Sequence, residues 1–265
     1  MIEAIITGLG AALDRLGPVA VAVSGGVDSM TLAWFAHRHL PGQVTQVHAL
    51  SPAVPAAATS RVRAYAEREG WRLRLIDAGE FSDPTYRANP VDRCFHCKRN
   101  LYGAVLAQVA GRVASGTNLD DLGDYRPGLL AARRFSVRHP YVEAGIDKAA
   151  VRMLAAHFGL HDLAALPASP CLSSRVETGI RIEASDLAFI DRVETLLRTE
   201  LAAAVVRCRR RHDGLVIELD EAALGRVGLA ESAGLRARLE AMCQTGGFGV
   251  PRYEAYRRGS AFLRP

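Results

Sequence analysis

Three short stretches of the sequence carry residue types that could do chemistry: SGGVDS at 24–29, CFHCK at 94–98 and VRCRRRH at 206–212. Glycines flanked by hydroxyl and carboxylate groups allow a backbone to approach an anion, and arginine forks match phosphate oxygens. Paired cysteines can ligate a metal or react as thiolates. The sequence therefore predicts phosphate chemistry together with metal or sulfur chemistry.

The SGGVDS turn lies between a predicted strand and a predicted helix. Residues 19–23 form a short β-branched run typical of a buried strand, and the apolar spacing over 30–36 predicts a helix. The first N–H groups of a helix lack internal partners and attract anions. The aspartate either caps the helix or holds a magnesium ion. An ordinary capped turn is the alternative; if the turn binds phosphate, the residues involved are Ser24, Gly25, Gly26, Asp28 and Ser29.

The elements that follow predict a parallel sheet. Strands at 43–50 and 71–77 flank a helix at 55–69, so the chain begins βαβαβ, and such sheets bind ligands beyond the carboxyl ends of their strands. Residues 78–97 read as irregular, and a helix is expected from Lys98. We expect an α/β fold with flanking helices over residues 1–178 and a smaller α+β domain over 179–265, with two strands around a turn, helices and a final strand.

Cys94 and Cys97 are three residues apart, which places them on one side of a turn or helix start. Such a pair can ligate metal, although two packed cysteines or a redox pair would give the same spacing. Cys171, in another irregular loop, is the natural third ligand, and three thiolates suit a four-iron cluster with one iron open. For Cys208 and Cys243 we expect packing.

The arginine-rich stretch at 206–212 is predicted to form a strand. Alternation places Arg207, Arg209 and Arg211 on one face and Cys208 and Arg210 on the other. That face could bind a phosphate group, and a solvated edge strand protected by charge is the alternative.

Composition limits the class of protein. The 265 residues are 49% hydrophobic and 23% charged, as in a globular protein. The sequence has no run of about 18 apolar residues, so we expect no membrane-spanning helix. Asp14 and Arg15 interrupt the segment that a signal peptide would keep apolar, which favours the cytoplasm. A net charge of +5 suits an anionic ligand, and the odd number of cysteines argues against a disulfide framework.

The strand–SGGVDS–helix unit resembles the PP-loop ATP pyrophosphatases, whose fold is that of the adenine nucleotide alpha hydrolases. The further stretches ASGTNLDDLGDYRPG, ASPCLSSRV, VRCRRRHDG and YRRGS make nearly the whole chain similar to the LarE family, pyridinium biscarboxylic acid mononucleotide sulfurtransferases of nickel-pincer cofactor synthesis. The resemblance implies adenylation of a substrate carboxylate by ATP, followed by replacement of AMP with sulfur.

The resemblance also implies roles for single residues. The five residues of the SGGVDS turn named above would hold pyrophosphate, and Lys98 would contact the phosphates. Arg207 and Arg209 would bind the substrate phosphate. Cys171 matches the sulfur-donating cysteine of the family. The added Cys94 and Cys97 resemble members that carry a [4Fe-4S] cluster, whereas members with one cysteine sacrifice its sulfur.

The same resemblance implies cofactors and partners for this chain, and it leaves two alternative functions open. ATP, Mg²⁺, a small mononucleotide and a sulfur donor, either hydrosulfide or a delivery protein, are expected, and the family tends toward homo-oligomers. A tRNA thiolase of the same superfamily is the nearest alternative, but the single arginine cluster has few aromatic neighbours and favours one phosphate over RNA. A non-catalytic nucleotide or iron–sulfur binding module is a further alternative.

Overall fold

The chain divides into two compact units in the computed structural model, which describes residues 2–123 and 126–257. The first unit comprises Met1–Asp83 and Asp92–Ala168, and the second comprises Pro84–Val91 and Ser169–Pro265. The short segment Pro84–Val91 thus belongs to the second unit, although the first unit surrounds it in sequence. Residues 124–125 of the DLGDYRPG loop and 258–260 of the YRRGS segment lie outside the described residues.

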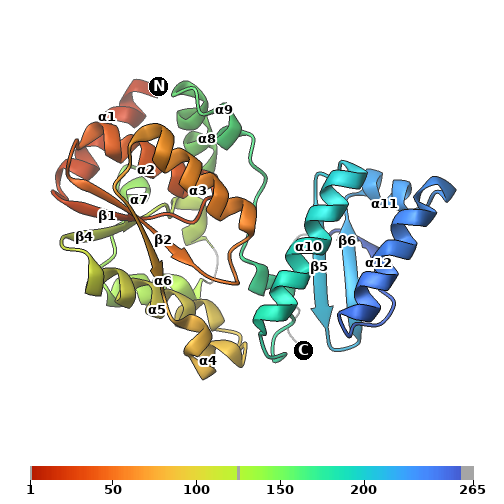
Figure 1. Ribbon diagram of the computed structural model, residues 1–265. Coiled ribbons are helices and arrows are strands. Elements are labelled where there is room, and N and C mark those ends of the chain that lie inside the picture. The colour runs from red at the N-terminus through yellow and green to blue at the C-terminus, as the bar shows by residue number, and fades with distance from the viewer. Residues whose placement is uncertain (1, 124–125, 258–265) are drawn as a thin grey trace. The chain divides into compact units, whose positions relative to one another are not determined.

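The first unit contains a four-stranded parallel sheet in the order β3-β2-β1-β4 (Figure 1). In register, Val19 of β1 lies opposite Val44 of β2 on one side and Arg112 of β4 on the other. The predicted α/β fold with a parallel sheet is confirmed. The strands are β1 (Val19–Ala22), β2 (Val44–Leu50), β3 (Leu73–Asp77) and β4 (Arg112–Ser115).

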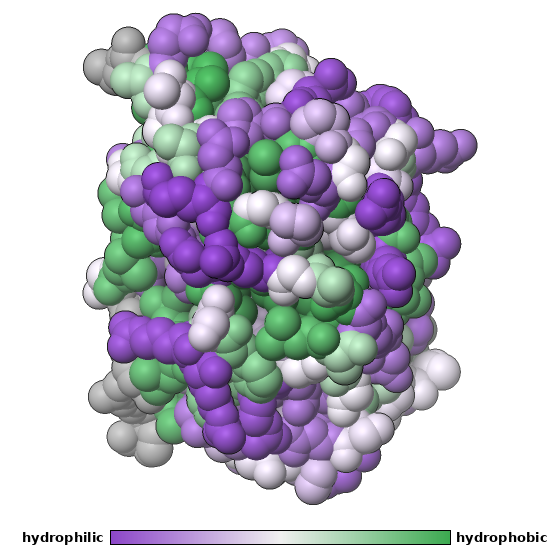
Figure 2. Space-filling view, turned by 90° about the vertical axis from the view of Figure 1, so that its left-hand side faces the viewer, coloured by the Kyte–Doolittle hydropathy of each residue, from purple (hydrophilic) through white to green (hydrophobic). Residues whose placement is uncertain are grey.

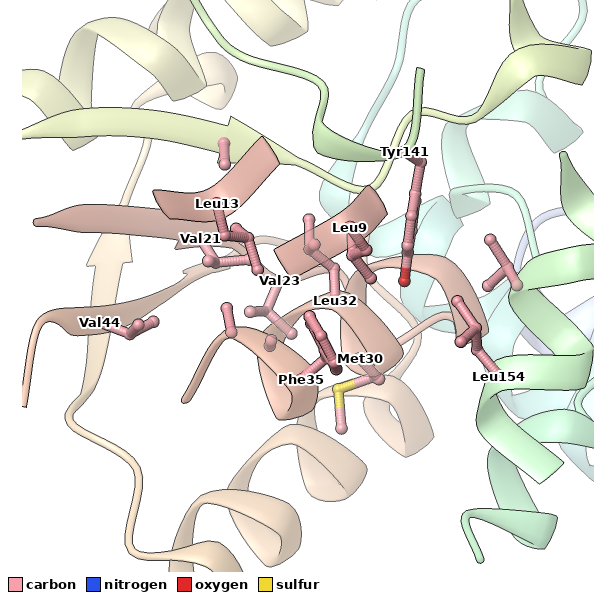
Figure 3. Close-up of a cluster of buried hydrophobic side chains, with 14 of the residues drawn as sticks. Leu9, Leu13, Val21, Val23, Met30, Leu32, Phe35, Val44, Tyr141 and Leu154 are labelled. Carbon is pink, nitrogen blue, oxygen red and sulfur yellow. The ribbon is translucent and has the colours of Figure 1, made fainter. Parts of the chain in front are cut away.

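Helices cover both faces of this sheet. One face packs against α1, α2, α3, α8 and α9, and Figure 3 shows this core with Leu9, Val21, Phe35 and Leu154. The other face carries Ala20, Val47 and Val113 against α5 and α6. The helical elements of this unit are α1 (Ile2–Asp14), α2 (Val27–His39), α3 (Ala56–Glu69), η1 (Glu80–Ser82), α5 (Arg93–Gln108), η2 (Leu119–Leu122), α6 (Pro127–Arg134), α7 (Pro140–Glu143), α8 (Lys148–His157) and α9 (His161–Ala164).

The second unit is built on a three-stranded sheet in the order β5-β6-β7, with β5 antiparallel and β7 parallel to β6. The two strands around a turn and the final strand predicted from the sequence are therefore present. The elements are α4 (Pro84–Arg87), η3 (Leu172–Arg175), α10 (Ala184–Leu201), β5 (Val206–Arg211), β6 (Gly214–Leu219), α11 (Glu221–Gly228), η4 (Ala230–Ser232), α12 (Ala233–Thr245) and β7 (Arg252–Ala255).

The segment Pro84–Val91 is bound tightly to the rest of the second unit. Tyr86 is buried, and its hydroxyl lies 2.7 Å from Oγ of Ser173. The amide of Asn89 donates to the carbonyl oxygens of Glu177 at 2.8 Å and Ile180 at 3.0 Å. These bonds fold the loop before α10 around the inserted segment.

One predicted boundary is wrong. The helix expected from Lys98 begins at Arg93, so Cys94 and Cys97 lie in the first turns of α5 and not in an irregular segment. Pro90 keeps the preceding residue out of the helical region, and the helix begins three residues later at Arg93.

The surface is mixed in character. Figure 2 shows hydrophilic and apolar residues interspersed over one face of the molecule. Within residues 2–123 and 126–257, no helix combines the length and apolar character that crossing a membrane requires.

Candidate functional site

The loops that follow β1 and β4 meet at the carboxyl edge of the parallel sheet. In the sheet, β1 lies between β4 on one side and β2 on the other. The chain leads from β1 through α2 to β2 and only later returns to form β4. Parallel sheets form a ligand-binding crevice where the strand order reverses in this way. A Cβ atom at Gly116, after β4, would lie 2.8 Å from the backbone nitrogen of Ser29, after β1. Glycine is therefore needed for this close approach.

The Ser24–Ser29 loop is closed by its own hydroxyl groups. The side chain of Ser29 accepts a bond from the backbone N–H of Ser24 at 3.0 Å and lies 3.1 Å from the hydroxyl of Ser24. Gly25 has φ +83°, and a Cβ there would lie 2.7 Å from the carbonyl oxygen of Ala58 in α3. The loop is thus shaped by a left-handed glycine and two paired serines.

Helix α2 begins at this loop without a side-chain cap. Gly26 occupies the N-cap position and has no side chain with which to bond to the N-terminal N–H groups. The N-terminus of α2 can therefore accept an anion. Asp28, for which the sequence allowed a capping role, lies in the first turn and bonds elsewhere.

Three residues that the sequence analysis did not single out hold Asp28. The side-chain amide of Asn118 donates to Oδ1 of Asp28 at 3.1 Å, and the ammonium of Lys148 forms an ion pair with Oδ2. The hydroxyl of Tyr141 donates to the carbonyl oxygen of Asp28 at 3.1 Å. Burial raises the pKa of Tyr141 well above its usual value, so the hydroxyl stays protonated and donates. The sequence held a signal for Asn118, because it lies in the ASGTNLDDLGDYRPG stretch that contributes to the family resemblance.

The other side of the loop is held by residues of β2 and α3. The guanidinium of Arg61 donates to the carbonyl oxygen of Gly25 at 2.7 Å. Nδ1 of buried His48 lies 2.8 Å from the carbonyl oxygen of Val23, and Nε2 lies 2.9 Å from the hydroxyl of Thr59. Burial lowers the pKa of His48, so the neutral ring donates through Nδ1 and accepts through Nε2.

The loop after β4 is held in place by hydrogen bonds of its own side chains and of His139. The hydroxyl of Ser115 lies 3.0 Å from that of Thr117 and 2.9 Å from Nδ1 of His139. Asn118 and Asp121 form a capping box at the start of η2. Burial lowers the pKa of His139. The residues between β4 and η2 are therefore fixed in the position that presents Asn118 to Asp28.

Lys98 and the paired cysteines lie on α5. Cys94 and Cys97 are partly buried. A Cβ at Gly128 of α6 would lie 3.1 Å from Cγ of Lys98, whose ammonium lies 5.8 Å from the ring centroid of Tyr102. In the part of the chain that the structure describes, no three His, Cys, Asp or Glu side chains are grouped as a metal site.

In the second unit, Cys171 is exposed and directly precedes η3. The guanidinium of Arg175 donates to the carbonyl oxygens of Pro170 at 2.7 Å and Cys171 at 3.2 Å. Its other nitrogens bond to both carboxylate oxygens of Glu194 at 2.9 and 3.0 Å. Although burial opposes both charges, this pairing raises the pKa of Arg175 and lowers that of Glu194. A buried ion pair thus fixes the backbone around an exposed thiol.

Arg207 and Arg209 are buried on β5. Arg209 lies 2.8 Å from a carboxylate oxygen of Glu218, which also receives a bond from Arg211 at 2.9 Å. The guanidinium of Arg207 lies 5.7 Å from the ring centroid of Tyr256. Burial, together with the charge of nearby Arg175, lowers the pKa of Arg207. A buried cation of this kind favours an anion beside it.

Cys208 and Cys243 have the packing role expected from the sequence. Both are fully buried. Burial raises the pKa of Cys208 well above its usual value and that of Cys243 to about 11. These two thiols are therefore kept in the unreactive form.

Comparisons with known proteins identify the family. No family model matches the chain. It is 33% identical over 221 residues to the pyridinium-3,5-bisthiocarboxylic acid mononucleotide synthase of Lactiplantibacillus plantarum, covering 81% of this chain and 79% of that protein. It is 35% identical over 223 residues to the uncharacterized protein slr1717 of Synechocystis sp., covering 83% and 82%. A Methanocaldococcus jannaschii protein, MJ0830, is 26% identical over 211 residues, covering 77% and 78%. From its identity to the synthase over four fifths of its length, the chain belongs to the LarE family.

Proposed function

We propose that this protein is an ATP-dependent sulfurtransferase that converts a carboxylate of a pyridinium mononucleotide into a thiocarboxylate, in the synthesis of the nickel-pincer nucleotide. The name of the Lactiplantibacillus plantarum relative describes a bisthiocarboxylic acid mononucleotide as its product. A carboxylate oxygen is a poor leaving group, so replacing it with sulfur requires activation. Transfer of AMP from ATP, with release of pyrophosphate, supplies that activation.

The observation that carries the proposal is the uncapped start of α2 beside the Ser24–Ser29 loop, at the edge where the strand order reverses. Its backbone N–H groups suit the oxygens of a polyphosphate. Asp28 offers carboxylate oxygen, the ligand type that Mg²⁺ prefers, and lies in the same turn. Asp28 would therefore hold Mg²⁺, which when bound neutralises phosphate charge, and Lys98 is proposed to contact the phosphates.

The substrate is proposed to bind through its phosphate to the second unit. Arg207 and Arg209 lie on β5, and Arg209 also bonds to the carbonyl oxygen of Ser174, three residues after Cys171. Such a placement would bring a mononucleotide anchored by its phosphate close to the thiol of Cys171. Its activated carboxyl carbon would then be attacked by sulfur, with AMP as the leaving group.

Cys171 is the proposed catalytic cysteine, and Cys94 and Cys97 are its proposed partners in holding a [4Fe-4S] cluster. Cysteine thiolates are the ligands that such clusters use, and α5 carries two cysteines three residues apart. When bound, the cluster would supply the transferable sulfide. If no cluster is held, Cys171 would sacrifice its own sulfur.

The remaining expectations belong to the same proposal. The protein acts in the cytoplasm as a homo-oligomer, and hydrosulfide or a delivery protein restores the sulfur. A tRNA thiolase is less well supported, because Arg210 and Arg211, the two less buried arginines of β5, pair with the carboxylates of Asp186 and Glu218 and so do not present a basic surface for RNA. Binding of nucleotide or cluster alone would not account for both the uncapped start of α2 and the exposed thiol of Cys171.

The decisive experiment measures pyrophosphate release from MgATP by protein purified without oxygen. We expect release only when a carboxylated pyridinium mononucleotide is added, together with a thiocarboxylate product found by mass spectrometry. Unmodified tRNA is the control acceptor. Release of pyrophosphate with tRNA would support the tRNA thiolase. Binding of ATP without release of pyrophosphate would support a non-catalytic binding module.

A further inference from the structure

Lysine is rare in this chain. The sequence contains 33 basic residues, of which 31 are arginines and two, Lys98 and Lys148, are lysines. Lys148 is the first residue of α8, directly after the cap residue Asp147, whose side chain accepts a bond from the N–H of Ala150 at 2.7 Å. The backbone at Lys148 is therefore fixed, while its side chain extends on a flexible four-carbon stem.

The ammonium of Lys148 and the carboxylate of Asp28 form an ion pair in which the two partners are held unequally. Asn118 donates to the second carboxylate oxygen of Asp28, and Tyr141 to its carbonyl oxygen, both at 3.1 Å. Asp28 is thus anchored from two further elements, the loop after β4 and the start of α7. If the pair is broken, Asp28 stays in place and Lys148 moves.

The pair can be reached and exchanged by a ligand. The side chain of Lys148 is 32% exposed and that of Asp28 is 26% exposed. Ion pairs between partly exposed groups contribute little net stability, so replacing this one costs little. Asp28 also lies in the first turn of α2, whose uncapped N–H groups suit phosphate oxygens.

We infer that Lys148 is a phosphate-binding residue whose charge Asp28 neutralises until a magnesium-bound polyphosphate arrives. This inference rests on the proposed function. Asp28 would hold the cation through a carboxylate oxygen, and the ammonium of Lys148, released from Asp28, would contact the phosphate oxygens. A lysine suits this exchange better than an arginine, because the arginine fork would bind the carboxylate bidentately and release it less readily.

The test is calorimetric binding of α,β-methylene ATP, which cannot be cleaved between its α and β phosphates, with and without Mg²⁺. With Mg²⁺, Lys148→Gln should bind at least about tenfold more weakly than the wild type, the effect of losing one charge-assisted hydrogen bond. Asp28→Asn should lose the stimulation by Mg²⁺. It should also bind the metal-free analogue at least as tightly as the wild type, because Lys148 is then free of its partner.

Two results would overturn the inference: unchanged affinity in Lys148→Gln, or weaker metal-free binding in Asp28→Asn. Arg134→Gln, which removes one charge from an exposed position of α6, is the matched control for net charge and unfolding midpoint. If the wild type itself fails to bind the analogue, the proposed function fails and not only the role of Lys148.

Amine acetylation provides a second readout that does not depend on turnover. With two lysines in the chain, mass spectrometry assigns each modified side chain without ambiguity. The magnesium-bound analogue should slow acetylation of Lys148. An equal rate with and without the analogue would contradict a phosphate contact.

Discussion

The guanidinium of Arg209 donates a hydrogen bond of 3.0 Å to the carbonyl oxygen of Ser174. A strand of candidate phosphate ligands is thereby joined to the backbone of the loop that carries Cys171. An isolated parallel β-bridge between Val176 and Arg210 adds a second contact between this loop and β5. In the second unit, the proposed anchor for the substrate and the proposed sulfur-bearing residue therefore form one connected structure.

Replacing Arg209 with lysine should weaken substrate binding and loosen the loop. A lysine cannot bond to both Glu218 and the carbonyl oxygen of Ser174 with the geometry of a fork. We expect the KM for the mononucleotide to rise roughly tenfold with ATP affinity unchanged, and Cys171 to be alkylated faster. Arg192→Lys, at an exposed position of α10, is the control. Equal KM values in the two variants would argue against a phosphate role for Arg209.

Replacing Gly25 with alanine should deform the anion-binding loop. Gly25 and Gly79 have similar backbone angles, φ +83° and +72°, but only Gly25 faces another backbone, since a Cβ there would lie 2.7 Å from the carbonyl oxygen of Ala58. Gly79→Ala should cost about 1–2 kcal/mol for the left-handed conformation alone. Gly25→Ala should cost more in urea unfolding and abolish binding of the ATP analogue. Similar losses in both variants would mean that the contact with α3 does not matter.

Replacing Cys94 with alanine tests the proposed cluster. Anaerobically purified wild type should hold about four irons and a matching amount of acid-labile sulfide per chain. Cys94→Ala, Cys97→Ala and Cys171→Ala should each lose both while keeping affinity for the ATP analogue. Cys243→Ala, which removes a buried thiol with a packing role, is the control. Iron retained in any of the three variants would exclude a three-cysteine cluster.

Acidification should destabilise the first unit. Burial lowers the pKa of His48 and His139 below the ordinary value of 6.5. Well above pH 6.5 these histidines are neutral in both the folded and the unfolded chain. As the pH falls through this value, the unfolded chain takes up protons first, so the free energy of unfolding decreases until the folded pKa values are reached. Urea unfolding between about pH 7.5 and 5.5 measures this slope, and His48→Gln should reduce it. A flat profile would contradict the burial of these rings.

The sequence predicts the elements well because the signals for them are local. The runs at β1 and β2 and the helical spacing of α2 and α3 need no distant partner to be recognised. The partners of Asp28 are different: Asn118, Tyr141 and Lys148 lie 90, 113 and 120 residues away. Only the parallel strand order brings them together, and periodicity says nothing of which polar groups will then meet. The early start of α5 escapes prediction because the CFHC stretch lacks apolar periodicity.

The insertion of Pro84–Val91 into the second unit has a consequence for how the two halves of this chain can be used. Cleavage at a single peptide bond cannot separate the two units intact. A fragment that begins at Ser169 lacks the inserted segment with Tyr86 and Asn89. The second unit cannot be moved to another protein by a simple end-to-end fusion. Any ancestor or engineered relative that exchanges one half must also exchange the segment Pro84–Val91 from inside the other half.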